Sequence, residues 1–260
     1  KVVINTLNTF TSLVIYDIKN NNIISTILGD LSEKNYSYED FRIFPHKNLP
    51  KNILIISYVR NSKHDHSLIT AFFDINKLKI IGKHIVLNYD GKMHKNWILI
   101  NVLKDTKNSR TTNNNFSPSP ISDDIYFTHW IENFNPLTLR QVNMHSGFSQ
   151  NLFIKSNNNK YKNLRGSTNF ITIKKHFYGF VHTKSLVPYY IKSIPIILDS
   201  SYEIIFLGNY PIIFSNTHVE YPMSILQEND YIYISVGVDD ICTNIYKFDI
   251  DSFKEIYSNK

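Results

Sequence analysis

The sequence predicts an all-β fold, and within that class a five-bladed β-propeller. Aromatic residues make up 14% of the 260 residues, with 17 Tyr and 17 Phe, and such side chains suit pleated, half-buried strands. No segment keeps a 3.6-residue apolar period over a dozen residues, which argues against alternating helices. Short β-type segments recur in a fixed order, four to a unit. That recurrence is the pattern of propeller blades.

Each unit opens on a polar cluster that leads into an apolar strand. These first strands begin near residues 40, 95, 165 and 220, so the units are spaced by 55, 70 and 55 residues. Second strands are predicted at 53–60, 125–131, 177–183 and 231–238. Third strands are predicted at 68–74, 137–143, 190–199 and 244–249, often ending in an Asp turn.

Weaker fourth strands are predicted at 79–81, 203–206 and 254–257, and the segments 12–17 and 23–28 supply a further partial unit. Four and a half units favour five blades in a single domain over residues 1–260. Because the first residue is Lys1, a longer parent chain stays open. The polar segments 106–120 and 151–164 are interpreted as exposed loops. The alternative fold is a β-sandwich with Greek-key connections.

The composition excludes several classes of protein. The net charge is +6, but only five of the 28 basic residues are Arg and the Lys are dispersed, so we expect no nucleic-acid partner. No apolar run approaches the ~18–20 residues that span a membrane. Cys242 is the single cysteine, so no intrachain disulfide forms. The sequence does not fix a location, although a cytoplasmic one is favoured.

The polar clusters predict where a site lies. The first strand of each propeller blade lines the central channel, so the starts of these strands converge around one channel mouth. The predicted ring contains Asp40, Arg42, Lys95, Asn96, Arg165, Thr168 and Glu220. Carboxylates and cations gathered there suit a sugar with an anionic partner. The alternative is that each of these residues only begins a strand in contact with solvent.

The same clusters carry a resemblance to a known family. Glu39-Asp40-Phe41-Arg42 resembles the Glu-Asp-Pro-Arg motif of the five-bladed mannoside phosphorylases of glycoside hydrolase family 130, whose fold the β-1,2-mannosyltransferases share. Lys95-Asn96-Trp97 and Arg165-Gly166-Ser167-Thr168 resemble segments of propeller proteins associated with glycosyltransferases. Residues 180–182 and 236–240 also have counterparts there. The resemblance spans residues 36–258, with departures at Phe41, His94 and Ser167.

The resemblance implies roles for these residues. Asp40 is implied as the catalytic acid or base, acting on the glycosidic oxygen or on an acceptor hydroxyl. Phosphate contacts are implied for Arg42, Lys95, Arg165 and His182, and Arg offers the planar fork that phosphate prefers. From the side chains themselves, sugar contacts are assigned to Tyr190, Glu220, Asp239 and Asp240, and substrate contacts of unspecified kind to Asn96 and Thr168. For His182, Tyr190 and the acidic residues, packing or turn roles are the alternative.

The leading functional hypothesis is an inverting glycosyltransferase, with β-mannosyl transfer as the particular case. Its partners would be a phosphorylated or nucleotide-activated sugar donor and a glycan acceptor. One alternative is an inverting mannoside phosphorylase or hydrolase, and another is a non-catalytic glycan-binding propeller. No cofactor and no metal are expected, because His64-Asp65-His66 lacks a third ligand nearby.

Overall fold

The structure is a computed structural model of the whole chain. It describes residues 11–17, 22–28, 36–46, 49–62, 66–87, 98–100, 124–131, 135–144, 146, 149–155, 164–186, 189–239 and 241–258. The chain divides into two compact units, residues 1–95 with 143–149 and residues 96–142 with 150–260. Each unit is described by itself, and a single domain over 1–260 stays a prediction.

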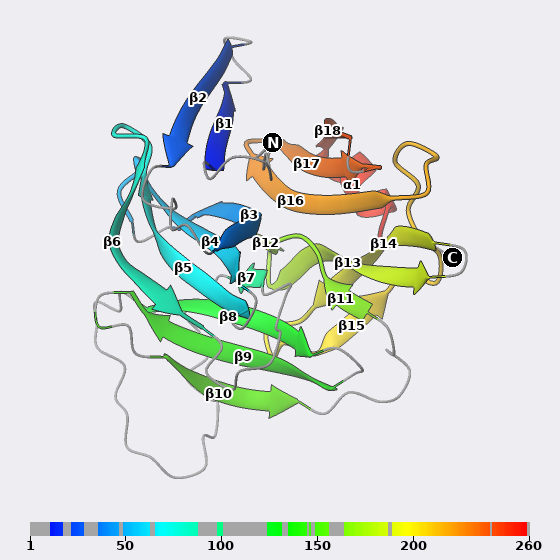
Figure 1. Cartoon of the computed structure of the whole chain (residues 1–260). Coiled ribbons are helices and arrows are strands. Elements are labelled where there is room, and N and C mark those ends of the chain that lie inside the picture. The colour runs from blue at the N-terminus through cyan, green and yellow to red at the C-terminus, as the bar shows by residue number, and fades with distance from the viewer. Residues whose placement is uncertain are drawn as a thin grey trace. The chain divides into compact units, whose positions relative to one another are not determined.

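The first unit holds two antiparallel sheets (Figure 1). In one, β1 (Thr11–Asp17) pairs with β2 (Asn22–Leu28). The other has four strands in chain order, β3 (Ser37–Pro45), β4 (Ile53–Asn61), β5 (His66–Asp74) and β6 (Lys79–Val86). The central stretch of β4 is buried without alternation, as expected for a strand that is covered on both faces.

The second unit holds three more sheets, apart from the end of β9 and the start of β10 (Figure 1). The first contains β7 (Ile98–Ile100), β8 (Asp124–Ile131), β9 (Asn135–Asn143) and β10 (Ser149–Lys155). The second contains β11 (Leu164–Gly166), β12 (Ile171–Ile173), β13 (His176–Leu186), β14 (Tyr189–Leu198) and β15 (Ile204–Leu207). The third contains β16 (Glu220–Glu228), β17 (Tyr231–Val238) and β18 (Cys242–Asp249), and α1 (Ile250–Glu255) follows it.

Successive sheets of the second unit pack face to face. On one face of β13, Phe177 and Val181 share a core cluster with Ile98 of the preceding sheet. On its other face, Phe180 packs with Ile234 of the following sheet. This stacking is that of neighbouring propeller blades. Within the described residues, the predicted strands of both units are confirmed apart from the one at 254–257, and the predicted strand start at 95–97 lies outside them. The described residues form five sheets, while the count of five blades stays a prediction.

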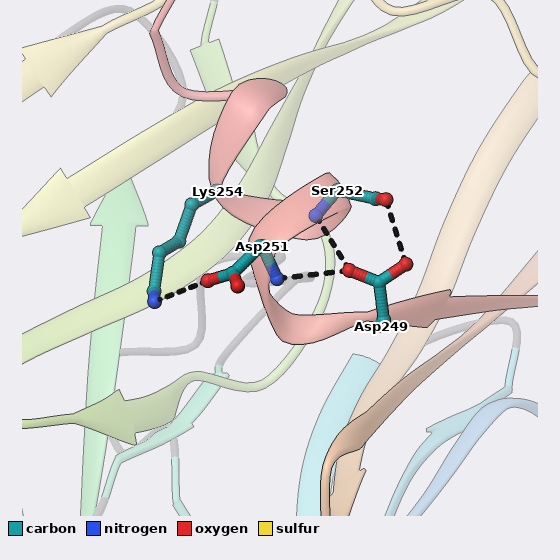
Figure 2. Close-up of polar contacts among 4 residues, drawn as sticks. All are labelled: Asp249, Asp251, Ser252 and Lys254. Carbon is teal, nitrogen blue, oxygen red and sulfur yellow. Dashed lines mark hydrogen bonds and ion pairs between the residues drawn. The ribbon is translucent and has the colours of Figure 1, made fainter.

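The predicted fourth strand at 254–257 is wrong, because this segment begins in the helix α1 and continues in a turn. Asp249 ends β18 and caps the helix, since its carboxylate accepts hydrogen bonds from the backbone N–H groups of Asp251 and Ser252 and from the Ser252 hydroxyl (Figure 2). Phe253 and Tyr257 then lie four residues apart and are both buried. A helical turn places both on one face, which a strand would not do.

The predicted loop at 151–164 is wrong in its first part, because β10 extends to Lys155. Residues 152–154 are Leu, Phe and Ile, and this short apolar run favours a strand. The surrounding Asn and Lys residues concealed it. Residues 156–163 lie outside the described residues, as does the predicted loop at 106–120.

Candidate functional site

A β-bulge in β3 contains Asp40. Glu39 pairs with Val59 and Arg42 pairs with Ser57, so Asp40 and Phe41 together oppose the single residue Tyr58. The Phe41 ring stacks on that of Tyr58, with centroids 5.1 Å apart. Bulges are over-represented beside active sites because they redirect side chains locally. The residue that the sequence assigns as acid or base therefore lies in a bulge, and its catalytic role stays a prediction.

Directly after the bulge, a row of polar residues crosses the sheet. Arg42 on β3 pairs with Ser57 on β4, and Ser57 pairs with Thr70 on β5. All three side chains are buried, Arg42 at 8% exposure. Residues that oppose each other in this way point to the same face of a sheet. We call these three residues the Arg42 row.

The second unit repeats this arrangement. Arg165 on β11 pairs with His182 on β13, and His182 pairs with Ser193 on β14. We call these residues the Arg165 row. His182 is 3% exposed and Ser193 is fully buried, whereas Arg165 is partly exposed. Two residues predicted to contact phosphate are thus neighbours on one face, with Cβ atoms of such pairs about 4.5–5.5 Å apart.

Residues 219–225, at the start of the last sheet, contact the Arg165 row and the strands beside it. Glu220 accepts a hydrogen bond at its backbone carbonyl from Ser193 Oγ, at 3.2 Å. The Tyr221 ring meets the His182 ring edge to face, with centroids 4.8 Å apart. Pro222 accepts a hydrogen bond at its carbonyl from Ser167 Oγ, at 2.6 Å. The segment therefore fixes both side chains that follow Arg165 in the row.

Thr168 has its polar groups bonded within its own sheet. Its hydroxyl accepts a hydrogen bond from Phe180 N at 2.9 Å, and its backbone N–H donates to Phe180 O at 3.2 Å. The side chain has no exposed surface. These contacts support a structural role in the Arg165-Gly166-Ser167-Thr168 segment, and a substrate contact by Thr168 stays a prediction.

Glu220 is fully buried, and its carboxylate faces the turn that precedes it. It accepts hydrogen bonds from Phe214 N at 2.8 Å, Ser215 N at 2.9 Å, Ser215 Oγ at 3.1 Å and Thr217 N at 3.2 Å. Burial on its own would raise the pKa of Glu220, but these hydrogen bonds outweigh it and hold the pKa below its ordinary value. A sugar contact by Glu220 also stays a prediction.

Of the remaining predicted site residues, two are described by the structure and three are not. Asp239 has a left-handed backbone, φ 48°, and its Oδ1 accepts a hydrogen bond from Val219 N at 3.0 Å. Tyr190 lies on β14, partly buried, opposite Ser185. Lys95, Asn96 and Asp240 lie outside the described residues. The ring around a channel mouth therefore stays a prediction, although two of its expected members, Asp40 and Arg42, are close in β3.

Sequence reasoning missed Ser193 and Tyr221. A signal for Ser193 was present, because Thr70 and Ser193 are hydroxyl residues on the third strands of two repeated units. No sequence signal distinguished Tyr221 among 17 tyrosines. Among the described residues, no cluster of His, Cys, Asp and Glu side chains could hold a metal ion. Nor does that part of the chain contain a helix of the length and apolarity needed to span a membrane.

Comparison with solved structures gives the fold. A glycosyl hydrolase from Bacteroides ovatus has a TM-score of 0.62 at 12% identity, over 94% of this chain and 76% of that chain. A second structure has a TM-score of 0.59 at 11% identity, over 94% of this chain and 76% of that chain. Its description states that the GH130 family of mannoside phosphorylases contains glycoside hydrolases that target β-1,2 mannosidic linkages in Candida mannan.

A third structure, the β-1,2-mannobiose phosphorylase from Listeria innocua in complex with β-1,2-mannobiose, has a TM-score of 0.56 at 12% identity, over 96% of this chain and 84% of that chain. No protein-family model matches the sequence, and no curated protein does. The chain thus has the all-β, propeller-type fold of these proteins. These three descriptions name glycoside hydrolases and mannoside phosphorylases and no glycosyltransferase, so the glycosyltransferase hypothesis gains no support from them.

Proposed function

We propose that the chain is a carbohydrate-active enzyme that cleaves β-mannosides with inversion, using inorganic phosphate as the attacking group. The likeness in fold to a β-1,2-mannobiose phosphorylase over 96% of the chain supports the class of reaction. One fold hosts many activities, however, so the reaction depends on the residues of the site.

The observation that carries the proposal is the pairing of Arg165 with His182. The guanidinium presents a fork of N–H donors that matches two phosphate oxygens, and the imidazole beside it offers a further N–H donor. Because Arg165 is partly exposed and His182 is buried, phosphate from solvent meets the guanidinium first. The imidazole N–H then donates a second hydrogen bond to the bound anion.

Asp40 is the proposed acid. In the reaction that the family resemblance implies, Asp40 supplies a proton to the glycosidic oxygen through a sugar hydroxyl, and that oxygen leaves with the bonding electrons. A phosphate oxygen forms the new bond to the anomeric carbon from the opposite face. The products are a sugar 1-phosphate and the shortened saccharide. The location of Asp40 in a β-bulge supports this role.

The test is incubation with β-1,2-mannobiose in the presence and absence of inorganic phosphate, followed by ³¹P NMR. A sugar 1-phosphate that appears only with phosphate is the expected product. Release of mannose without phosphate would identify a hydrolase, and turnover only with a nucleotide-sugar and an acceptor would identify a transferase. Saturable saccharide binding with no turnover under any condition would identify a non-catalytic glycan-binding propeller.

Two substitutions connect the reaction to the residues. Asp40→Asn should abolish turnover, whereas Asp230→Asn, in an exposed turn of the second unit, should leave it unchanged. Arg165→Lys should raise the KM for phosphate about ten- to a hundredfold, since a hydrogen bond to a charged group contributes about 1.5–3 kcal/mol. Lys175→Arg, at an exposed turn, is the matched control for the exchange of one basic side chain for another. An unchanged KM in Arg165→Lys would contradict the assigned phosphate contact.

A further inference from the structure

The turn before β16 is held by one buried carboxylate. Four donors of residues 214–217 converge on Glu220, three of them on Oε1 and one on Oε2. The side chain has no exposed surface. Carboxylates accept hydrogen bonds and donate none when ionised, so a cluster made only of donors selects a carboxylate.

Other contacts fix the far side of the same turn. Tyr246 donates its hydroxyl to Phe214 O at 2.9 Å, and Lys192 donates through Nζ to Thr217 O at 2.6 Å. Backbone hydrogen bonds from Ile191 N to His218 O and from Ile212 N to Ser193 O attach the segment to β14. The turn is therefore bonded on both sides, and Glu220 is the residue at which it enters the last sheet.

Glu220 also connects this turn to the Arg165 row. Its backbone carbonyl accepts the Ser193 hydroxyl, and Tyr221, the next residue, packs its ring against His182. A shift of Glu220 would therefore move two groups that contact the row. Site residues need support from neighbours that hold them within a fraction of an ångström.

We propose that Glu220 is a positioning residue for the phosphate site: its buried carboxylate fixes the 214–217 turn and thereby holds Tyr221 against His182, so that the imidazole stays beside Arg165. This inference rests on the proposed function, because it takes the Arg165 row as the phosphate site. It differs from the sequence-based interpretation, in which the Glu220 carboxylate binds a sugar directly.

The principal test is steady-state phosphorolysis by Glu220→Gln. The amide keeps the shape of the carboxylate but turns an N–H₂ group toward donors, which disrupts the turn. We expect the KM for phosphate to rise about tenfold while kcat changes less than about twofold, the pattern of lost ground-state binding. Glu255→Gln, at an exposed position of α1, is the matched control and should behave as the wild-type protein. An unchanged phosphate KM in Glu220→Gln would overturn the proposal.

A double-mutant cycle tests the route through Tyr221. If Glu220 acts by holding the Tyr221 ring on His182, then Glu220→Gln combined with Tyr221→Leu should raise the phosphate KM no further than the worse single variant. Additive effects would show that Glu220 acts by another route, and would overturn the proposed one. If Glu220 only stabilised the fold, its effect on the phosphate KM would add to that of Tyr221→Leu. The cycle therefore separates positioning of His182 from a general contribution to stability.

Two further measurements keep the proposal testable if activity or folding fails. The ¹H–¹⁵N signals of the His182 ring should shift in Glu220→Gln and not in Glu255→Gln, whether or not phosphorolysis occurs, and an unshifted ring would overturn the positioning role. If Glu220→Gln does not fold, Ser215→Ala removes one of the four donors to the carboxylate, at 3.1 Å, together with the 3.2 Å hydrogen bond between the Ser215 and Thr217 hydroxyls, and should give smaller changes in the same direction. If the wild-type protein shows no turnover, the proposed function is refuted. The NMR signals of the His182 ring in Glu220→Gln then decide whether Glu220 positions that ring.

Discussion

The side chain of Asn169 forms two hydrogen bonds with the backbone of Ile225: Oδ1 accepts from Ile225 N at 3.0 Å and Nδ2 donates to Ile225 O at 2.8 Å. The amide thus replaces a neighbouring strand for one residue of β16. Asn169 lies between β11 and β12, so the pair joins two sheets of the second unit. Together with the bond from Ser167 to Pro222, it connects these sheets through side chains where their backbones do not pair.

Asn169→Ala should destabilise the protein. The substitution leaves the N–H and C=O groups of Ile225 without their partner, and each unsatisfied buried polar group costs about 1–3 kcal/mol. Urea unfolding followed by fluorescence should show a lower midpoint with an unchanged slope. Asn244→Ala, at an exposed position on β18, should unfold as the wild-type protein does. Equal midpoints for the two variants would contradict the role of Asn169.

Gly179→Ala should be destabilising for a steric reason. A Cβ atom at Gly179 would lie 2.8 Å from Cδ1 of Phe170, a ring that is 3% exposed and packed in the core. Overpacking of this kind costs about 1–3 kcal/mol. At Gly237 the nearest atoms would lie at 3.7 Å, so Gly237→Ala is the matched control and should be neutral or slightly stabilising. Thermal unfolding of both variants, side by side, measures the difference.

The pH dependence of stability should include a contribution from Glu220. Its folded-state pKa is lowered, so the unfolded state binds its proton first as the pH falls. The stabilisation is complete above the ordinary glutamate pKa of about 4.3 and is lost as the pH falls through the lower folded value. Asp74 and Asp249 also have lowered pKa values, so the comparison must be with Glu220→Gln. Wild type should lose more unfolding free energy between pH 6 and pH 3 than this variant.

Substitution of the α1 cap should have graded effects. Asp249→Asn keeps an oxygen that can accept from Asp251 N and Ser252 N, whereas Asp249→Ala removes every cap hydrogen bond (Figure 2). The melting temperature should therefore fall from wild type to Asn to Ala at neutral pH. Because the pKa of Asp249 is lowered by its Ser252 hydrogen bonds, the advantage of wild type over Asn should shrink as the pH falls below 4. The opposite order would exclude the capping role.

The sequence was sufficient to place most strands because each was marked by local chemistry. Asp74 and Asp199 end or follow third strands and bind backbone N–H groups two to four residues ahead, which is how Asx turns act. The same rule failed at Asp249, where the Ser252 hydroxyl donates a further hydrogen bond to the carboxylate and the buried Phe253 favours a helical turn. An Asp can begin either an Asx turn or a helix, and which of the two forms depends on whether the residues after it are buried on one face.

The candidate site was less predictable because its residues depend on strand register. The pairing of Arg165 with His182, 17 positions apart in the sequence, follows only once β11 and β13 are aligned. The bulge at Asp40 and Phe41 likewise has no marker in the sequence, because neither Gly nor Pro occurs in Glu39-Asp40-Phe41-Arg42. The internal role of the Glu220 carboxylate depends on a turn whose residues, 214–217, carry no motif.

The Tyr257 hydroxyl donates to Gly179 O at 3.0 Å, across a separation of 78 residues. Tyr178 and Phe180, which flank that glycine, form ring contacts with Tyr257. On a ribosome, the sheet that contains β13 is therefore synthesised long before the residue that closes its core. During this interval its aromatic face is covered only in part, by residues such as Ile234, and is open to association with other chains, as is common for partly synthesised proteins. The segment around Tyr257 is synthesised last, so the time until it packs on β13 sets how long the nascent chain can associate with other chains through this face.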